Sequence, residues 1–201
     1  MGALDPNMFG RYRVASIPPL AFLAILAVAG CGEAGGEGPG ASGPEGAGLT
    51  AEAFPGSAPS LDALGRGVLV GFASSDTAAL ASYRLGEAEH NEIVFPELPA
   101  GRSEVGYPVD LAWQNIELRN GRSLGRQLPW FQGRDVEHLE TVCRGQTEAF
   151  ETFRVHTDCW VIFKEATYGR LEVQLFKDAL ERGGGWKLFR YYDELPRRDG
   201  S

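Results

Sequence analysis

Apolar residues recur at three- and four-residue steps between residues 60 and 133, which predicts helices in that part of the chain. One helix is expected over 61–72, and Ser75-Asp76 offers an N-cap for a second over 77–85. A third opens at Pro108 and is expected to stop at Asn120-Gly121, a dipeptide typical of a left-handed C-cap, with a further helical face over 124–133. The acidic stretch 87–92 around His90 predicts a solvated segment.

After residue 133 the apolar period changes from helical to two, which predicts four antiparallel strands, at 136–144, 152–164, 169–178 and 185–193. In the strand over 152–164, one face is expected in the core and carries Phe153, Val155, Thr157, Cys159, Val161 and Phe163. The opposite face carries Arg154, His156, Asp158, Trp160 and Ile162. Helices followed by an antiparallel meander predict an α+β fold, with N-terminal helices packed on one four-stranded sheet.

The first 31 residues have the pattern of an export signal, because Arg11 and Arg13 precede an apolar run that ends in small residues. Residues 17–30 would reach only about 20 Å as a helix, against a hydrocarbon core of roughly 30 Å. The sequence Val28-Ala-Gly-Cys31 resembles the lipobox of bacterial lipoproteins, with Val28 where that family usually has Leu. This resemblance implies that Cys31 is lipidated and becomes the mature N-terminus. The alternatives are an ordinary secretory signal or a buried apolar helix.

Composition divides the chain into a signal peptide (1–30), a lipidated cysteine with a Gly-rich tether (31–60), a globular domain (61–195) and a short tail (196–201). The net charge is -8, and we expect no nucleic acid partner because no basic patch stands out. The lipobox implies a bacterial cell envelope protein, attached to the membrane through its lipid. By analogy with enterobacterial lipoproteins, Gly32 favours the outer membrane, facing the periplasm.

Cys143 and Cys159 are an even pair in an oxidising compartment. A hairpin centred near residue 151 places residue 143 opposite 159 on the inner face, which predicts a disulfide, with two buried free thiols as the alternative. His138 and His156 complete a set that resembles a zinc site. Strand parity points each His away from its neighbouring Cys, so neither a metal nor a cofactor is expected unless a β-bulge intervenes.

Weak acid–base candidates are Arg154, His156, Asp158 and Glu172, together with Tyr191 or Tyr192. Because the His-Asp pair falls on the outer strand face, a solvated polar surface is the simpler interpretation. Trp160 and Ile162 lie in the same row and predict a partner surface, through which two copies of the chain would form a homodimer. The alternative is that a helix or loop of the same chain covers them.

The segment Ser75-Asp-Thr-Ala-Ala-Leu80 between two short helices, then a long strand, then Gly185-Trp-Lys-Leu-Phe189, resembles the nuclear transport factor 2 superfamily over residues 60–193. Residues 153–189 also resemble a group of uncharacterised bacterial lipoproteins. The resemblance implies a cone of the NTF2-like or cystatin-like kind, which hosts isomerases, subunits and scaffolds. A non-catalytic ligand- or partner-binding module is the leading hypothesis. An isomerase- or hydratase-type enzyme and a subunit of an envelope assembly are the alternatives.

Overall fold

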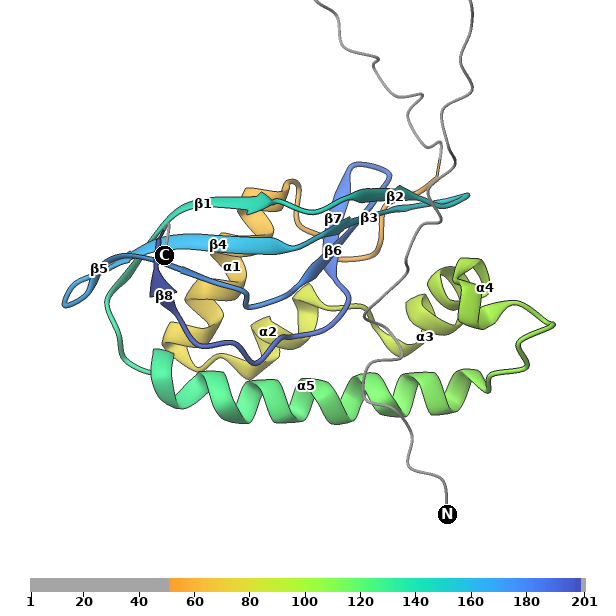
Figure 1. The fold of residues 1–201 in the computed structure, drawn as a ribbon, viewed down its shortest axis with the longest axis horizontal. Helices are drawn as coiled ribbons and strands as arrows, with labels where there is room; N and C mark the ends of the chain where they lie inside the picture. Colours follow the sequence, from red (N-terminus) through yellow and green to blue (C-terminus); the bar gives the residue numbers. More distant parts are fainter. Residues whose placement is uncertain (1–50, 200–201) are drawn as a thin grey trace, which may run out of the picture. The chain divides into compact units, whose positions relative to one another are not determined.

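The computed structural model describes residues 51–199, so the predicted signal peptide, Cys31 and the first part of the tether lie outside the described residues. The described part is α+β, with helices first and two antiparallel sheets after them (Figure 1). Its helices are α1 (Leu61–Ser74), α2 (Thr77–Tyr83), α3 (Glu87–Glu89), the π-helical η1 (His90–Val94), α4 (Phe95–Glu97), the 3-10 turn η2 (Pro99–Gly101) and α5 (Val109–Phe131). Within residues 51–199, no helix combines the length and apolarity needed to cross a bilayer.

Helices α1 and α2 begin at side-chain caps, as their sequences predict. Ser60 Oγ accepts the backbone N–H of Ala63 at 3.1 Å, and Asp76 Oδ1 accepts that of Ala79 at 2.9 Å. Ser75 between the two helices is left-handed, with φ of 56°. A polar residue that tolerates this conformation can therefore end one helix directly before the cap of the next.

The stop predicted at Asn120-Gly121 is wrong, because α5 continues through it to Phe131. Asn120 is 3% exposed, and its side-chain oxygen accepts the backbone N–H of Tyr191 at 2.9 Å. Ser123, one turn later, donates to the carbonyl of Tyr191 at 3.1 Å. Asn120 thus satisfies a distant backbone group instead of capping its own helix.

The strands form two sheets, which corrects the prediction of a single one. One has the order β1-β4-β5-β8 and the other the order β2-β3-β6-β7. The strand bounds are Val136–Cys143 (β1), Thr147–Ala149 (β2), Arg154–Thr157 (β3), Cys159–Glu165 (β4), Gly169–Val173 (β5), Asp178–Arg182 (β6), Gly185–Leu188 (β7) and Arg197–Arg198 (β8). The strand expected over 152–164 is divided at Asp158, whose φ of 57° interrupts the extended backbone. Its halves, β3 and β4, therefore pair in different sheets.

The larger core lies between α1, the C-terminal half of α5 and the inner face of β4. The predicted inward residues Cys159, Val161 and Phe163 are at most 1% exposed there. Phe72 of α1 packs against the rings of Phe131 and Tyr191, with centroids 5.6 and 5.3 Å away. A second core unites Phe54, Leu85, Val94, Phe153 and Leu180. The predicted inner face of one strand is thus shared between two cores.

The folded unit extends beyond the predicted limits of 61 and 195. Phe54 is 2% exposed, and Ala58 exchanges backbone hydrogen bonds of 2.9 and 2.8 Å with Trp186. At the other end, β8 pairs with β5 through Arg197 and Arg198, which the sequence places in a tail. Both end segments are too short and polar to show a period of their own, and they are ordered by the sheets that they join.

Candidate functional site

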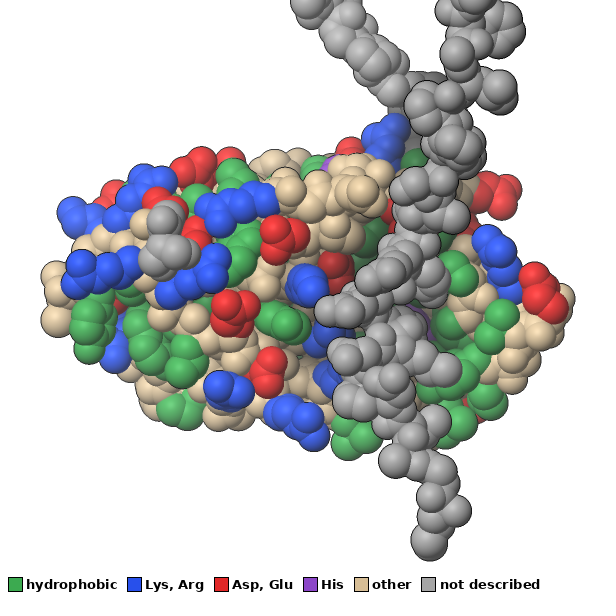
Figure 2. All heavy atoms as spheres, viewed as in Figure 1, with side chains coloured by type: hydrophobic (Ala, Val, Ile, Leu, Met, Phe, Trp, Pro, Cys, Tyr) green, Lys and Arg blue, Asp and Glu red, His purple; other side chains and the backbone are tan. Residues whose placement is uncertain are grey.

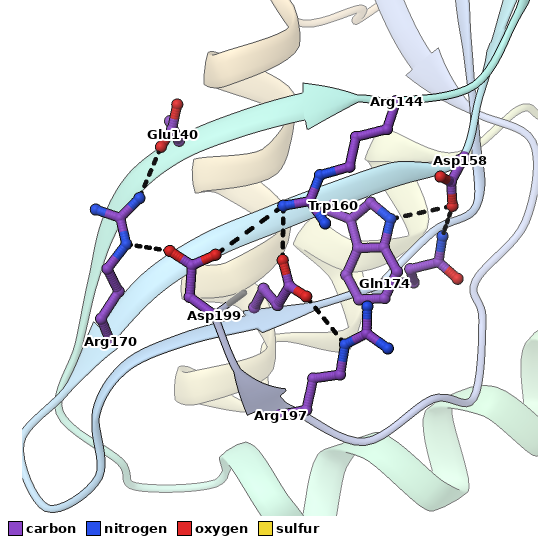
Figure 3. A network of polar contacts seen from close by, with 9 residues as sticks. Glu140, Arg144, Asp158, Trp160, Arg170, Gln174, Arg197 and Asp199 are labelled. Atoms are coloured by element: carbon purple, nitrogen blue, oxygen red, sulfur yellow. Dashed lines mark hydrogen bonds and ion pairs between the residues drawn. The ribbon is translucent and has the colours of Figure 1, made fainter. Parts of the chain in front are cut away.

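The outer face of the sheet β1-β4-β5-β8 is built around Trp160 on β4 (Figure 3). The guanidinium carbons of Arg197 and Arg144 lie 4.1 and 5.2 Å from the centre of its ring. The indole N–H of Trp160 donates to Asp158 at 3.0 Å, and Gln174 donates to the same carboxylate oxygen at 2.7 Å. The stacked guanidinium groups leave Trp160 only 6% exposed.

Glu172 on β5 holds both arginines in place. It is 1% exposed and accepts hydrogen bonds from Arg144 at 2.6 Å and from Arg197 at 2.9 Å. The hydrogen bond to Glu172 raises the pKa of Arg144. A buried carboxylate with two charge-assisted bonds is a structural centre, because its acceptor oxygens are already occupied.

Asp199, at the C-terminal side of β8, extends this network to Arg170, which also donates to Glu140 at 2.9 Å. The hydrogen bond from Arg170 lowers the pKa of the Asp199 carboxyl, although burial acts in the opposite direction. The last described residues are therefore tied to β5 by ion pairs as well as by the backbone pairing of β8.

The prediction that Trp160 and Ile162 form an exposed partner surface is wrong. They are 6% and 3% exposed, and β8 with its ion pairs lies on the same side of the sheet. The structure agrees instead with the alternative, because β8 of the same chain covers this strand face at Trp160. A homodimer through this sheet face stays a prediction, without the exposed apolar patch that motivated it.

His156 lies in the other sheet, away from Asp158 and Glu172. Its Nε2 is 3.0 Å from Glu181, and its Nδ1 is 3.1 Å from the hydroxyl of Thr147. Arg154 reaches the same Glu181 carboxylate at 3.7 Å. The structure therefore brings two of the four acid–base candidates together and separates them from the other two. A histidine between a hydroxyl and a carboxylate can take part in acid–base chemistry. The side chains of His156 and Glu181 are 19% and 23% exposed.

Thr147 and Glu181 were missed by the sequence analysis. Glu181 lies opposite Arg154 in the β3–β6 pairing, but the predicted third strand ended at residue 178, so Glu181 fell in a turn. Extending that strand by four residues in the β4–β5 register would place residue 180 opposite Arg154, so the observed pairing with Glu181 depends on the one-residue shift between the two sheets.

His90 itself is buried, which corrects the prediction for that residue, whereas Glu87 and Glu92 of the same acidic stretch are exposed as predicted. His90 is 1% exposed and packs against the rings of Trp113, Phe95 and Phe189, with centroids 5.4 to 6.0 Å away. Burial lowers the pKa of His90, so its ring is neutral near pH 7. Next to it, the buried amine of Lys187 lies 2.8 Å from Glu89. Both polar groups are part of the packing beneath α3 and η1.

The predicted disulfide is present and joins Cys143 to Cys159 at paired positions of β1 and β4. A bulge does interrupt β1 between His138 and Glu140, but both sulfurs are taken by the disulfide. His138 instead contacts the hydroxyl of Thr141 at 2.8 Å. Among residues 51–199, no group of three or more His, Cys, Asp and Glu side chains is arranged to hold a metal ion.

A shallow depression of about 370 Å³ lies between α1 and α2. Its floor is made of small residues, and a Cβ at Gly67 would approach the Tyr83 hydroxyl to 2.3 Å. None of the predicted site residues lines it.

Comparison with known proteins identifies no relative: no family model matches the chain, and neither the curated proteins nor the solved structures contain a match.

Proposed function

We propose that this chain is a lipid-anchored protein of the bacterial cell envelope whose folded unit is a non-catalytic binding module. The anchor rests on the lipobox-like sequence that ends at Cys31, which lies twenty residues before the first described residue. Even fully extended, twenty residues span at most about 70 Å, so an anchor there keeps the folded unit near the bilayer. Gly32 favours the outer membrane, with the unit in the periplasm.

The observation that carries the non-catalytic part is the internal pairing of the candidate groups. Glu172 is occupied by Arg144 and Arg197, and Asp158 by Trp160 and Gln174. A general acid or base needs a lone pair or proton directed at a substrate, and these carboxylates direct theirs at the protein. Their removal is expected to lower stability and not an activity.

We also propose that the fold is an NTF2-like cone. Support comes from the two capped helices before the sheets and from the bend at Asp158, which divides the long strand between the sheets. A second candidate function, an isomerase- or hydratase-type enzyme, is favoured by the hydrogen bond between His156 and Glu181. Such an enzyme would require a substrate to displace Glu181 or Thr147 from the imidazole.

The anchor is tested by replacing the lipidated cysteine in the full chain. After a wash in roughly 0.5 M salt, which screens surface charge, we expect Cys31→Ser to move the protein from the membrane fraction to the soluble fraction and to abolish incorporation of labelled palmitate. Gly36→Ser, in the tether, is the matched control and should change neither. Membrane retention of the Ser variant, with no palmitate in the wild-type protein, would refute the anchor.

A further inference from the structure

Five basic side chains lie along α5 and the C-terminal segment, and we refer to them as the cationic strip: Arg119, Arg122, Arg126, Lys177 and Arg190. The three from α5 are spaced at i, i+3 and i+7, which places them on one flank of the helix. Lys and Arg side chains appear over the middle of α5 and beside the C-terminal segment in Figure 2.

The C-terminal segment runs along this flank because α5 binds its backbone. Asn120 and Ser123 bond to Tyr191, and Gln127 donates to the carbonyl of Tyr192 at 3.2 Å. Residues 190–194 are thus fixed beside Arg119, Arg122 and Arg126.

Tyr192 brings the remaining two cations together. Its ring centre lies 5.5 Å from the guanidinium carbon of Arg190 and 5.8 Å from the amine of Lys177. The bridge between Phe176 and Tyr191 places the two segments that carry these cations side by side. Cations from three parts of the sequence therefore lie around one aromatic ring and one helix flank.

Counterions are sparse along the strip. Arg126 lies 3.7 Å from Asp193, and among residues 51–199 the other four cations make no ion pair within 4.0 Å. Elsewhere, six arginines are paired with carboxylates, namely Arg84, Arg134, Arg144, Arg154, Arg170 and Arg197, whereas Arg66, Arg102 and Arg182 make no ion pair within 4.0 Å among the described residues. Burial lowers the pKa of Arg190 and the like charge of Arg119 lowers it further, while the carboxylates of Asp178 and Asp193 raise it. In a chain with net charge -8, five cations on one helix flank and around one ring, with a single ion pair among them, require an explanation.

We propose that the cationic strip binds phosphate groups of anionic lipids at the bilayer surface. Donors from several elements suit a phosphate, which has multiple acceptor oxygens, better than a carboxylate, which a single arginine can occupy. The lipid source follows from the anchor, so this inference rests on the proposed function: a unit held near the bilayer meets lipid phosphates at high local concentration.

Two acidic groups, Asp178 and Asp193, oppose such a ligand, and Asp193 already pairs with Arg126. Arg190 and Lys177 interact electrostatically with Asp178, but among the described residues neither forms an ion pair with it within 4.0 Å. Burial raises the pKa of Asp178, the two cations lower it, and Asp158 raises it again. Its negative charge should weaken phosphate binding, so Asp178→Asn is expected to strengthen it.

The test uses the full chain with Cys31→Ser, which removes the lipid and separates this inference from the anchor. Co-sedimentation is measured with vesicles of phosphatidylglycerol and phosphatidylcholine, and with phosphatidylcholine alone. We expect binding to the anionic vesicles above the neutral baseline, and a loss of that excess in 0.5 M salt, roughly the range in which surface charges are screened. Arg119→Gln with Arg190→Gln should weaken the excess about tenfold or more.

Arg66→Gln with Lys164→Gln is the matched control, because it removes two exposed charges outside the strip. Each variant should retain a cooperative unfolding transition. Equal weakening by the control pair, or no excess on anionic vesicles, would overturn the inference. A rise in melting temperature with inorganic pyrophosphate, without vesicle binding, would also overturn it and assign the strip to a soluble phosphate compound.

Discussion

Asp158 shows how one residue can divide a strand between two sheets. Its left-handed backbone, with φ of 57°, is tolerated because an aspartate can bond locally, and here its carboxylate accepts the indole N–H of Trp160. The same carboxylate accepts a hydrogen bond from the side-chain amide of Gln174, just after β5. Contacts from β4 and from the end of β5 therefore hold the bend in place.

Asp178 makes stability depend on pH. Because burial raises the pKa of this carboxyl in the folded chain, the folded state binds the proton more tightly than the unfolded state. Its contribution to stability is therefore complete below the ordinary value of 3.8 and is lost as pH rises through the folded-state pKa. We expect Asp178→Asn to raise the free energy of unfolding at pH 7 by on the order of 1 kcal/mol, and to have little effect at low pH.

Urea unfolding of wild-type and variant protein between pH 3 and pH 7 measures this effect. Asp193→Asn is the control, because that carboxylate is partly exposed beside Arg126. The same pH dependence in wild type and Asp178→Asn would contradict the assignment.

At the scale of elements, α5 both packs against the larger core and binds the C-terminal segment. Asn120, Ser123 and Gln127 repeat on its buried side and bond to the backbone of the C-terminal segment, which there makes an isolated bridge to Phe176 but belongs to no strand. Buried backbone groups are thereby satisfied by helix side chains, as their burial requires.

Two neighbouring substitutions in α5 should act in opposite directions. Gly121→Ala is expected to stabilise the chain by about 0.5–1 kcal/mol, because this helical position is exposed and an added Cβ meets no atom within 4 Å. Asn120→Ala should destabilise it by about 1–3 kcal/mol, because the Tyr191 N–H loses its acceptor. Thermal unfolding distinguishes them. Destabilisation by Gly121→Ala would indicate instead a left-handed helix end at this position.

For the whole folded unit, the C-terminal strand covers Trp160 on a sheet face that also carries Glu140 and Glu172. Arg197 on β8 stacks on Trp160 and binds Glu172, while Asp199 pairs with Arg170. Removal of β8 together with Asp199 would therefore uncover Trp160, break three ion pairs and free the edge of β5, a combination that promotes association between chains.

Deletion of residues 196–201 is accordingly expected to increase self-association relative to the whole chain, measured by sedimentation velocity. Deletion of residues 200–201 alone is the control and should leave the sedimentation unchanged. Trp160→Gln in the shorter chain should reduce the association again. A shortened chain that sediments like the intact protein would show that β8 is not the protective element.

Features that depend on near neighbours or on strand parity were predictable from the sequence. These include the helix cap at Asp76, the change of period after residue 133, the α+β class, and the pairing of Cys143 with Cys159. Each follows from backbone hydrogen bonds over a few residues, or from the alternation of side chains in one hairpin.

Only the tertiary structure decided which polar groups became partners. Asn120 bonds to a residue 71 positions away, and His156 to one 25 positions away. Neither local propensity nor periodicity predicts such contacts. The burial of Trp160 likewise depends on Arg197, from a segment whose sequence resembles a tail. The sequence by itself determined the first two helices, the change from helices to strands after residue 133 and the disulfide, whereas the tertiary structure decided the length of α5, the division into two sheets, the burial of Trp160 and His90, and the gathering of the cationic strip. The physical reason is that local backbone geometry limits the choice of element, while long-range side-chain partners become defined only when the elements pack.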